Sequence, residues 1–119
     1  MAVETALKPA VRRLVQGIRR YAAAQGWNRD DYRIYVETKA MWGRIGVILV
    51  ARTFPGRDEY DQWVSVKHFL QKDLNDESDL FASLNLVLRT FDQIDQDETY
   101  RVSSGYEDVD DVFPTGRID

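Results

Sequence analysis

The apolar positions near the start of the chain recur with the period of a helix. Within residues 6–25 they fall at spacings of three and four, at Leu7, Val11, Leu14, Ile18, Tyr21 and Ala22. This is the 3.6-residue period of an amphipathic helix. Because Pro9 is tolerated only in a first turn, we expect the helix to begin between Thr5 and Lys8. Gly26 is well placed to end it in a left-handed cap.

Two strand patterns follow this helix. Residues 32–39 alternate apolar and polar side chains, with Tyr32, Ile34, Val36 and Thr38 on one side. A period of two predicts a strand with one buried face. Residues 44–52 form an almost continuous apolar run, which predicts a central strand covered on both faces. Residues 40–43 are expected to form the hairpin turn, since Gly43 is free to adopt a positive φ.

The next two segments each fit two periods. Residues 58–74 form a helix if Asp58 is the N-cap, with Tyr60, Trp63, Leu70 and Leu74 on one face. They contain a strand over 63–70 if the β-branched side chains of Val64 and Val66 determine the local structure. Residues 80–94 form a helix, or a strand over 84–91. On a helix Leu86 would lie alone on the polar side, so we prefer a helix at 58–74 and a strand at 84–91.

Both alternatives predict the same fold class. We expect an α+β fold with a small, mostly antiparallel sheet of three to four strands and two main helices packed on it. A further short strand is predicted at 99–103. At 119 residues the chain fits one domain, which we assign to residues 1–105. Residues 106–119 form an acidic C-terminal tail that we expect to be mobile unless docked.

Composition narrows the chemistry that the chain can perform. It has no cysteine, which excludes a disulfide framework, a thiolate zinc site and a cysteine nucleophile. The lack of cysteine fits a reducing compartment, so we expect a cytoplasmic protein. The longest apolar run, residues 47–51, is far shorter than the roughly 20 residues that span a bilayer, and no membrane passage is expected.

No catalytic or metal-binding motif is recognisable. His68 is the single histidine, and no nucleophile signature such as GxSxG accompanies it, so we interpret it as a surface side chain. The acidic run 92–98 fails the calcium-loop pattern, because Tyr100 and Tyr106 occupy the positions of the required Gly and Glu when the loop is counted from Asp95. We therefore expect no cofactor and no metal.

Charge is divided unevenly along the chain. Residues 1–52 carry ten Lys or Arg and four acids, a net +6, whereas residues 53–119 carry six and sixteen, a net −10. The predicted first helix has a basic face without an interspersed acid, made of Lys8, Arg12, Arg13, Arg19 and Arg20. The tail offers acids and an apolar anchor at Glu107, Asp108, Asp110, Asp111 and Phe113. We expect the tail to rest on this basic face, in its own chain or in a second copy, and to mask it from polyanions.

Three functions are compatible with these features. The leading interpretation is a non-enzymatic protein–protein interaction or assembly module, with a protein partner or self-association as a dimer. The first alternative is nucleic-acid binding through the basic face, because a cluster of cations without acids suits a polyanion. The second is an enzyme with an unrecognised carboxylate site, because paired carboxylates contributed by separate elements leave no sequence motif.

Overall fold

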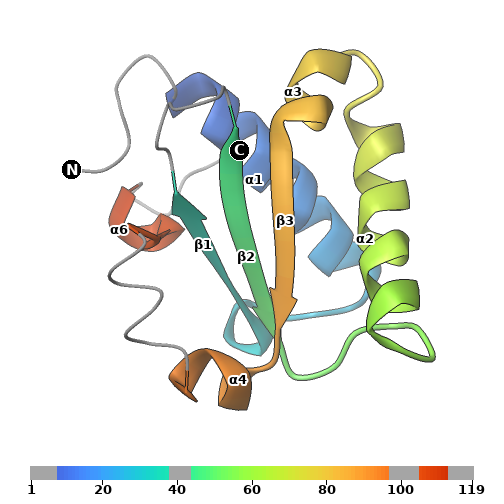
Figure 1. Cartoon of the computed structure of the whole chain (residues 1–119), viewed down its shortest axis with the longest axis vertical. Helices are drawn as coiled ribbons and strands as arrows, with labels where there is room; N and C mark the ends of the chain where they lie inside the picture. Colours follow the sequence, from blue (N-terminus) through green and yellow to red (C-terminus); the bar gives the residue numbers. More distant parts are fainter. Residues whose placement is uncertain (1–7, 38–43, 97–104, 113–119) are drawn as a thin grey trace.

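Two long helices cover one face of a four-stranded sheet in the computed structural model of the chain (Figure 1). The structure describes residues 8–37, 44–96 and 105–112. The long helices are α1 (Lys8–Ala24) and α2 (Glu59–Asp73). The strands are β1 (Tyr32–Glu37), β2 (Ile45–Ala51), β3 (Leu84–Arg89) and β4 (Glu107–Asp108). The predicted α+β class, with two main helices on a small sheet, is confirmed.

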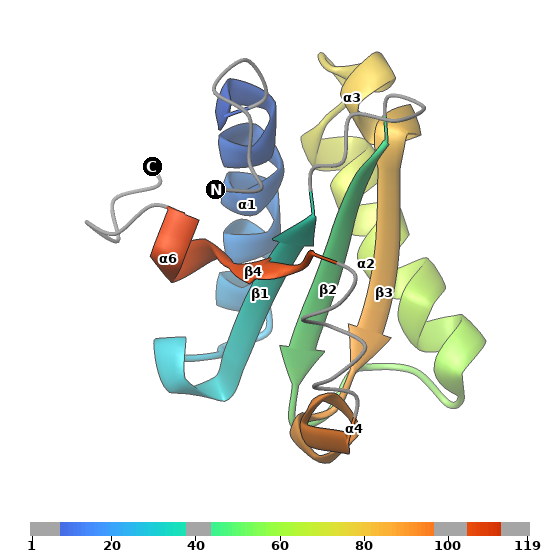
Figure 2. The same cartoon turned by 60° about the vertical axis from the view of Figure 1, so that its left-hand side comes forward.

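The sheet has the order β3-β2-β1-β4 and is mostly antiparallel. β1 pairs with β2 in antiparallel register, with Tyr32 opposite Ala51, and β4 pairs with β1 in the same sense. β3 is parallel to β2, with α2 on the connection between them. The C-terminal segment crosses back to form β4 on the side of β1 away from β3 (Figure 2). β3 and β4 are therefore the two edges of the sheet.

α1 forms and ends as its apolar pattern predicts. It begins at Lys8, and its stripe of Val11, Leu14, Ile18 and Tyr21 is fully buried. Beyond its last residue, the N–H of Trp27 donates to the carbonyl of Ala22 at 3.0 Å, while Gly26 has a φ of 76°. This is a left-handed glycine cap, which another residue would adopt only with strain. The cap turns Trp27 back onto the ring of Tyr21, at 5.7 Å between centroids.

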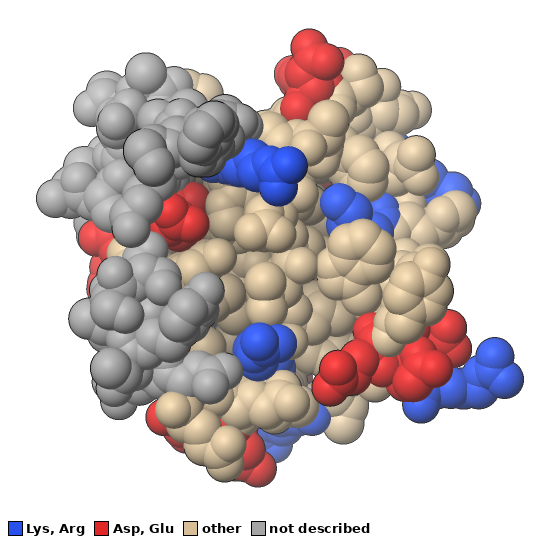
Figure 3. All heavy atoms as spheres, in the orientation of Figure 1, with Lys and Arg blue, Asp and Glu red and all other residues tan. Residues whose placement is uncertain are grey.

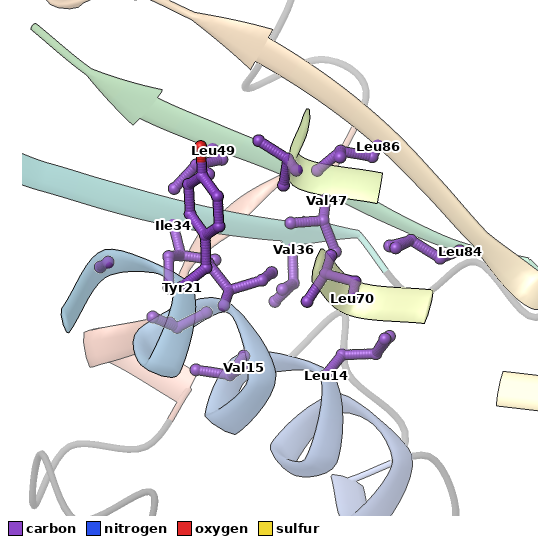
Figure 4. Close-up of a cluster of buried hydrophobic side chains, with 14 of the residues drawn as sticks. Leu14, Val15, Tyr21, Ile34, Val36, Val47, Leu49, Leu70, Leu84 and Leu86 are labelled. Carbon is purple, nitrogen blue, oxygen red and sulfur yellow. The ribbon is translucent and has the colours of Figure 1, made fainter. Parts of the chain in front are cut away.

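β2 is buried at every position, as its continuous apolar run predicts. On the helix side, Val47 and Leu49 belong to the main core together with side chains of α1, α2 and β1 (Figure 4). On the opposite side, Ile48 and Val50 belong to a second cluster with Ile94 and two tyrosines, Tyr35 and Tyr106. The sheet therefore has a core on each face.

The helix at 58–74 and the strand near 84–91 are confirmed, but the expected face of the helix is wrong. Asp58 caps α2 by accepting from the N–H of Asp61 at 2.8 Å. The buried side chains are Val66, Leu70 and Leu74, while Tyr60 is 71% exposed. Tyr60 lies about 120° around the helix from Val66, at 100° per residue, and so points outward. The i, i+4 series, rather than the aromatic residues, marks the face that packs on the sheet.

Several short elements were not expected from the sequence. They are η2 (Arg29–Asp31), α3 (Ser78–Ser83), α4 (Phe91–Gln96) and α6 (Val109–Val112). β3 ends at Arg89, so the end of the predicted strand falls in α4. The predicted turn at 40–43 and strand at 99–103 lie outside the described residues. Among the described helices, none combines the length and the apolar character that crossing a membrane requires.

Candidate functional site

Two arginines of the predicted basic face bind the end of α2. Asp73 accepts from Arg20 Nε at 2.6 Å and from Arg13 Nη1 at 2.9 Å. Arg13 Nη2 also donates to the main-chain oxygen of Asp73 at 2.7 Å. A Cβ added to Gly17 would lie 2.8 Å from the Asp73 carboxylate, so the lack of a side chain at Gly17 leaves room for this carboxylate beside α1. Arg13 and Arg20, two of the four described side chains of the basic face, therefore hold α1 and α2 together.

The Asp73 carboxylate is stabilised in its charged form. The hydrogen bond from Arg20 is the largest cause that holds the pKa of Asp73 below its ordinary value, and Arg13 adds to it. Burial acts in the opposite direction but is outweighed. An arginine that shares a well-aligned carboxylate is less available to a polyanion, so this part of the basic face is neutralised within the chain.

Arg19 turns instead toward the C-terminal segment. Its Nη1 donates to the Tyr32 hydroxyl at 2.9 Å, and its Nη2 lies 3.4 Å from Asp110 Oδ1. Arg29 Nη2 reaches the same oxygen at 2.8 Å. Thus Asp110 of the expected tail rests on the basic face of its own chain.

The remaining residues of the predicted basic face are Arg12 and Lys8. Arg12 is exposed on α1, and the side chain of Lys8 lies outside the described residues.

A small polar cavity surrounds this contact. It has a volume of about 210 Å³, and its charged lining is Arg19, Arg29, Arg33, Asp30, Asp108 and Asp110. Three arginines and three aspartates balance, so the cavity has no excess of positive charge with which to attract an anion. Burial is the main cause that raises the pKa of Asp108. Arg19 and Arg29 bind the C-terminal segment here through Asp110.

The first part of the expected tail is anchored by apolar side chains. Tyr106, Val109 and Val112 are buried, and β4 joins the edge of the sheet. Full burial of a valine is worth about 1.5 to 3 kcal/mol, whereas an exposed ion pair such as those of Asp110 contributes about 0 to 1 kcal/mol. Asp111 is exposed and Glu107 half-buried. Phe113 lies outside the described residues.

His68 and the acidic run form no site in the described part of the chain. His68 is exposed on α2 and does not line the small polar cavity around Asp110. Residues 92–96 of the acidic run belong to α4 (Phe91–Gln96), which contributes Ile94 to the second core. Over residues 8–37, 44–96 and 105–112, no group of three or more metal-ligating side chains comes together.

The outer face of α2 carries a feature that the sequence did not reveal. Tyr60 is 71% exposed, and Trp63 and Val64 are each 38% exposed; within the described residues these are the exposed large apolar side chains. We call these three residues the α2 apolar cluster. Scattered exposed apolar residues are ordinary, but neighbours on one helix form a patch that suits a protein partner. The i, i+4 pair of Tyr60 and Val64 is the signal in the sequence that could have shown it.

A groove of about 440 Å³ opens between the start of α2 and β3. Trp63 forms one wall, and its indole N–H donates to the carbonyl of Leu86 at 3.0 Å. Lys67 Nζ lies 5.3 Å from the centre of the Trp63 ring and 4.4 Å from that of Phe81, and burial lowers its pKa. Trp63 is thus fixed in place beside the groove.

The first prediction concerns the carboxylate between α1 and α2. The pKa of Asp73 is lower in the folded than in the unfolded chain. The ionised carboxylate therefore stabilises the fold at any pH above the ordinary carboxyl pKa. This stabilisation is lost as the pH falls through the pKa that Asp73 has in the folded chain. Asp73→Asn should lower the free energy of unfolding by about 1 to 3 kcal/mol at pH 7. The difference in the free energy of unfolding between the variant and the parent protein should become smaller below about pH 4.

Urea unfolding at pH 7 and pH 3 measures this difference. Asp76→Asn is the matched control, because Asp76 is exposed and its ion pair with Arg13 is longer, at 3.4 Å. It should change stability by no more than about 0.5 kcal/mol. A loss for Asp73→Asn that is the same at both pH values would show that the ionised carboxylate is not its cause.

The second prediction concerns masking of the basic face. Deletion of residues 106–119 would remove core side chains, so the sharper change is Asp110→Asn, which removes the negative charge paired with Arg19 and Arg29. If Asp110 masks these arginines, the variant should elute from heparin at higher salt than the parent protein. Asp92→Asn on α4 is the control because it changes the net charge equally. Equal elution of the two variants would contradict masking.

Comparison of the chain with protein-family models, with curated proteins and with solved structures finds no match.

Proposed function

We propose that this chain is a non-enzymatic protein–protein interaction or assembly module that binds its partner through the outer face of α2. The observation that carries the proposal is the exposure of Tyr60, Trp63 and Val64 side by side on one helix. Tyrosine and tryptophan are the side chains that most often dominate binding energy at protein interfaces. The proposal places the module in the cytoplasm, which the lack of cysteine fits.

The shape and chemistry of the adjoining groove support the same function. Its lining combines apolar side chains such as Phe54 and Leu88 with the polar Glu59, Gln62 and Gln93. Interfaces commonly have an apolar centre and a polar rim. Because Trp63 is already held by Leu86 and Lys67, little side-chain entropy remains to be lost when a partner docks against it.

Nucleic-acid binding is the weaker candidate. Arg13, Arg19 and Arg20 all have carboxylate partners within the chain. A polyanion would have to displace these partners before it gained the counterion release that drives binding. An enzyme is weaker still. The groove beside α2 is lined by one carboxylate, Glu59, without a histidine or a second acid to share proton transfer. The three aspartates of the cavity around Asp110 are matched there by three arginines.

The third prediction tests the proposed surface directly. A photo-crosslinking phenylalanine analogue placed at Val64 should give discrete adducts with protein in the cells that make the chain. The same analogue at Ala24, an exposed position at the end of α1, is the control. Adducts at position 64 should be several-fold more abundant than at position 24, as judged by immunoblot and mass spectrometry. Equal labelling at both positions, or adducts with nucleic acid alone, would refute the proposal.

A further inference from the structure

Residues 105–112 lie along the outer edge of the sheet and pair with it over a short distance. Within the described residues their strand, β4, pairs with β1 at two positions, Asp108 opposite Tyr35 and Glu107 opposite Val36. The helix that follows, α6, has four residues and is too short to be stable alone. Figure 3 shows acidic atoms at the surface beside α6. The segment is therefore held mainly by its side chains rather than by main-chain pairing.

The apolar side chains of this segment reach both faces of the sheet. Tyr106 belongs to the second core, whereas Val109 and Val112 belong to the main core. A Cβ added to Gly46 of β2 would lie 2.7 Å from the Tyr106 hydroxyl oxygen. The lack of a side chain at Gly46 thus leaves the room that Tyr106 occupies, and docking of the segment depends on this fit.

Docking also leaves polar groups buried without a partner. The described residues contain three side-chain atoms that are buried and make no hydrogen bond, and two of them lie at this contact. They are Arg19 Nε and Glu107 Oε2. In water these groups would be hydrogen-bonded, so their burial opposes docking. A segment that combines apolar anchors with such groups is held less firmly than the core of the fold.

Asp108 makes the docking sensitive to pH. Burial is the main cause that raises its pKa, and the N–H of Asp110, which donates to Asp108 Oδ1 at 2.8 Å, acts in the opposite direction. The charged side chains around it are Asp110 and Asp111 of α6, Arg33 of β1, Arg19 of α1, and Arg29 and Asp30 of η2. A carboxyl group whose pKa is raised by docking contributes stability that is fully present below its ordinary pKa. This contribution is lost as the pH rises through the raised value.

We propose that residues 105–112 form a releasable strap, which detaches from β1 as one unit while the rest of the fold stays intact, and so controls access to this edge of the sheet. Release uncovers the outer main-chain groups of β1, and an edge strand with free main-chain groups accepts a further strand. It also separates Arg19 and Arg29 from Asp110. The inference goes beyond the proposed function, because it concerns the edge of the sheet opposite to the one beside α2.

The fourth prediction is that the strap opens without unfolding the sheet. In the full-length protein at pH 7, the amide hydrogens of residues 105–112 should exchange with solvent at least about 100-fold faster than those of β2, once each rate is corrected for its local sequence. Native-state hydrogen exchange, read by mass spectrometry, measures both segments in one experiment. Exchange of the two segments at the same rate would show that the strap opens only when the whole chain unfolds, and would overturn the proposal.

Asp108→Asn distinguishes the strap from an ordinary frayed end. The amide oxygen still accepts from the N–H of Asp110, while the charge that burial disfavours is absent. Exchange of the strap should therefore become several-fold slower at pH 7, with β2 unchanged, and the difference from the parent protein should become smaller toward about pH 4. Asp95→Asn, at an exposed position of α4, is the matched control and should have no effect. Equal slowing in both variants, or none in either, would overturn the proposal.

Gly46→Ala provides an opposite change from outside the strap. The added methyl group crowds the Tyr106 hydroxyl, so exchange of the strap should become about tenfold faster while α1 stays protected. In the Tyr106→Phe background the contacting oxygen is absent, and the same substitution should accelerate exchange less. An acceleration that is equal in both backgrounds, or that extends to α1, would show that the strap is not released through Tyr106 and would overturn the proposal.

Discussion

The structure depends on the need to cover both faces of β2. Each of its seven positions is buried, and burial of a single large aliphatic side chain is worth about 1.5 to 3 kcal/mol. α1 and α2 cover one face. The other face is covered with the help of α4 and Tyr106, which means that the chain has to cross the sheet again after β3. The C-terminal segment is therefore part of the fold, and its return brings Asp110 to Arg19 and Arg29.

The same constraint determines where α2 lies. The connection from β2 to the parallel β3 passes through α2, so the helix covers the outer part of the sheet beside its edge strand. Its inner side chains, Val66 and Leu70, fill the core, and its last residue, Asp73, binds two arginines of α1. The outer side has no neighbouring element to cover it in the described structure. This is why Tyr60 and Val64 are exposed on a helix that is otherwise firmly packed.

Elements with one dominant period could be predicted from the sequence, whereas contacts between distant residues could not. α1 and β2 follow from their apolar patterns, and the position of Leu86 favoured the strand that forms in the ambiguous 80–94 region. α4 and α6 are too short to be stable alone, and they form because Ile94, Val109 and Val112 are buried by tertiary packing. Local patterns do not specify which residues come together across the fold.

The candidate site was missed for a related reason. The ion pairs that Arg13 and Arg20 of the predicted basic face form with Asp73 join residues 60 and 53 positions apart, a separation over which periodicity carries no information. In α2, two aromatic residues suggested the buried face because large rings are usually interior. The actual buried face is the i, i+4 series of Val66, Leu70 and Leu74.

The exposed aromatic residues of α2 differ in what they contribute to the fold. Tyr60 contributes little to the core at 71% exposure, and a polar side chain at its position would cost the fold little. Trp63 is different, since its indole N–H blocks an outward carbonyl of β3 while one side of its ring remains open to solvent. One tryptophan thus protects the edge strand from unspecific pairing and presents a rigid apolar surface beside it. The arrangement closes part of the sheet edge to strand pairing and leaves the apolar side chains of α2 exposed beside it.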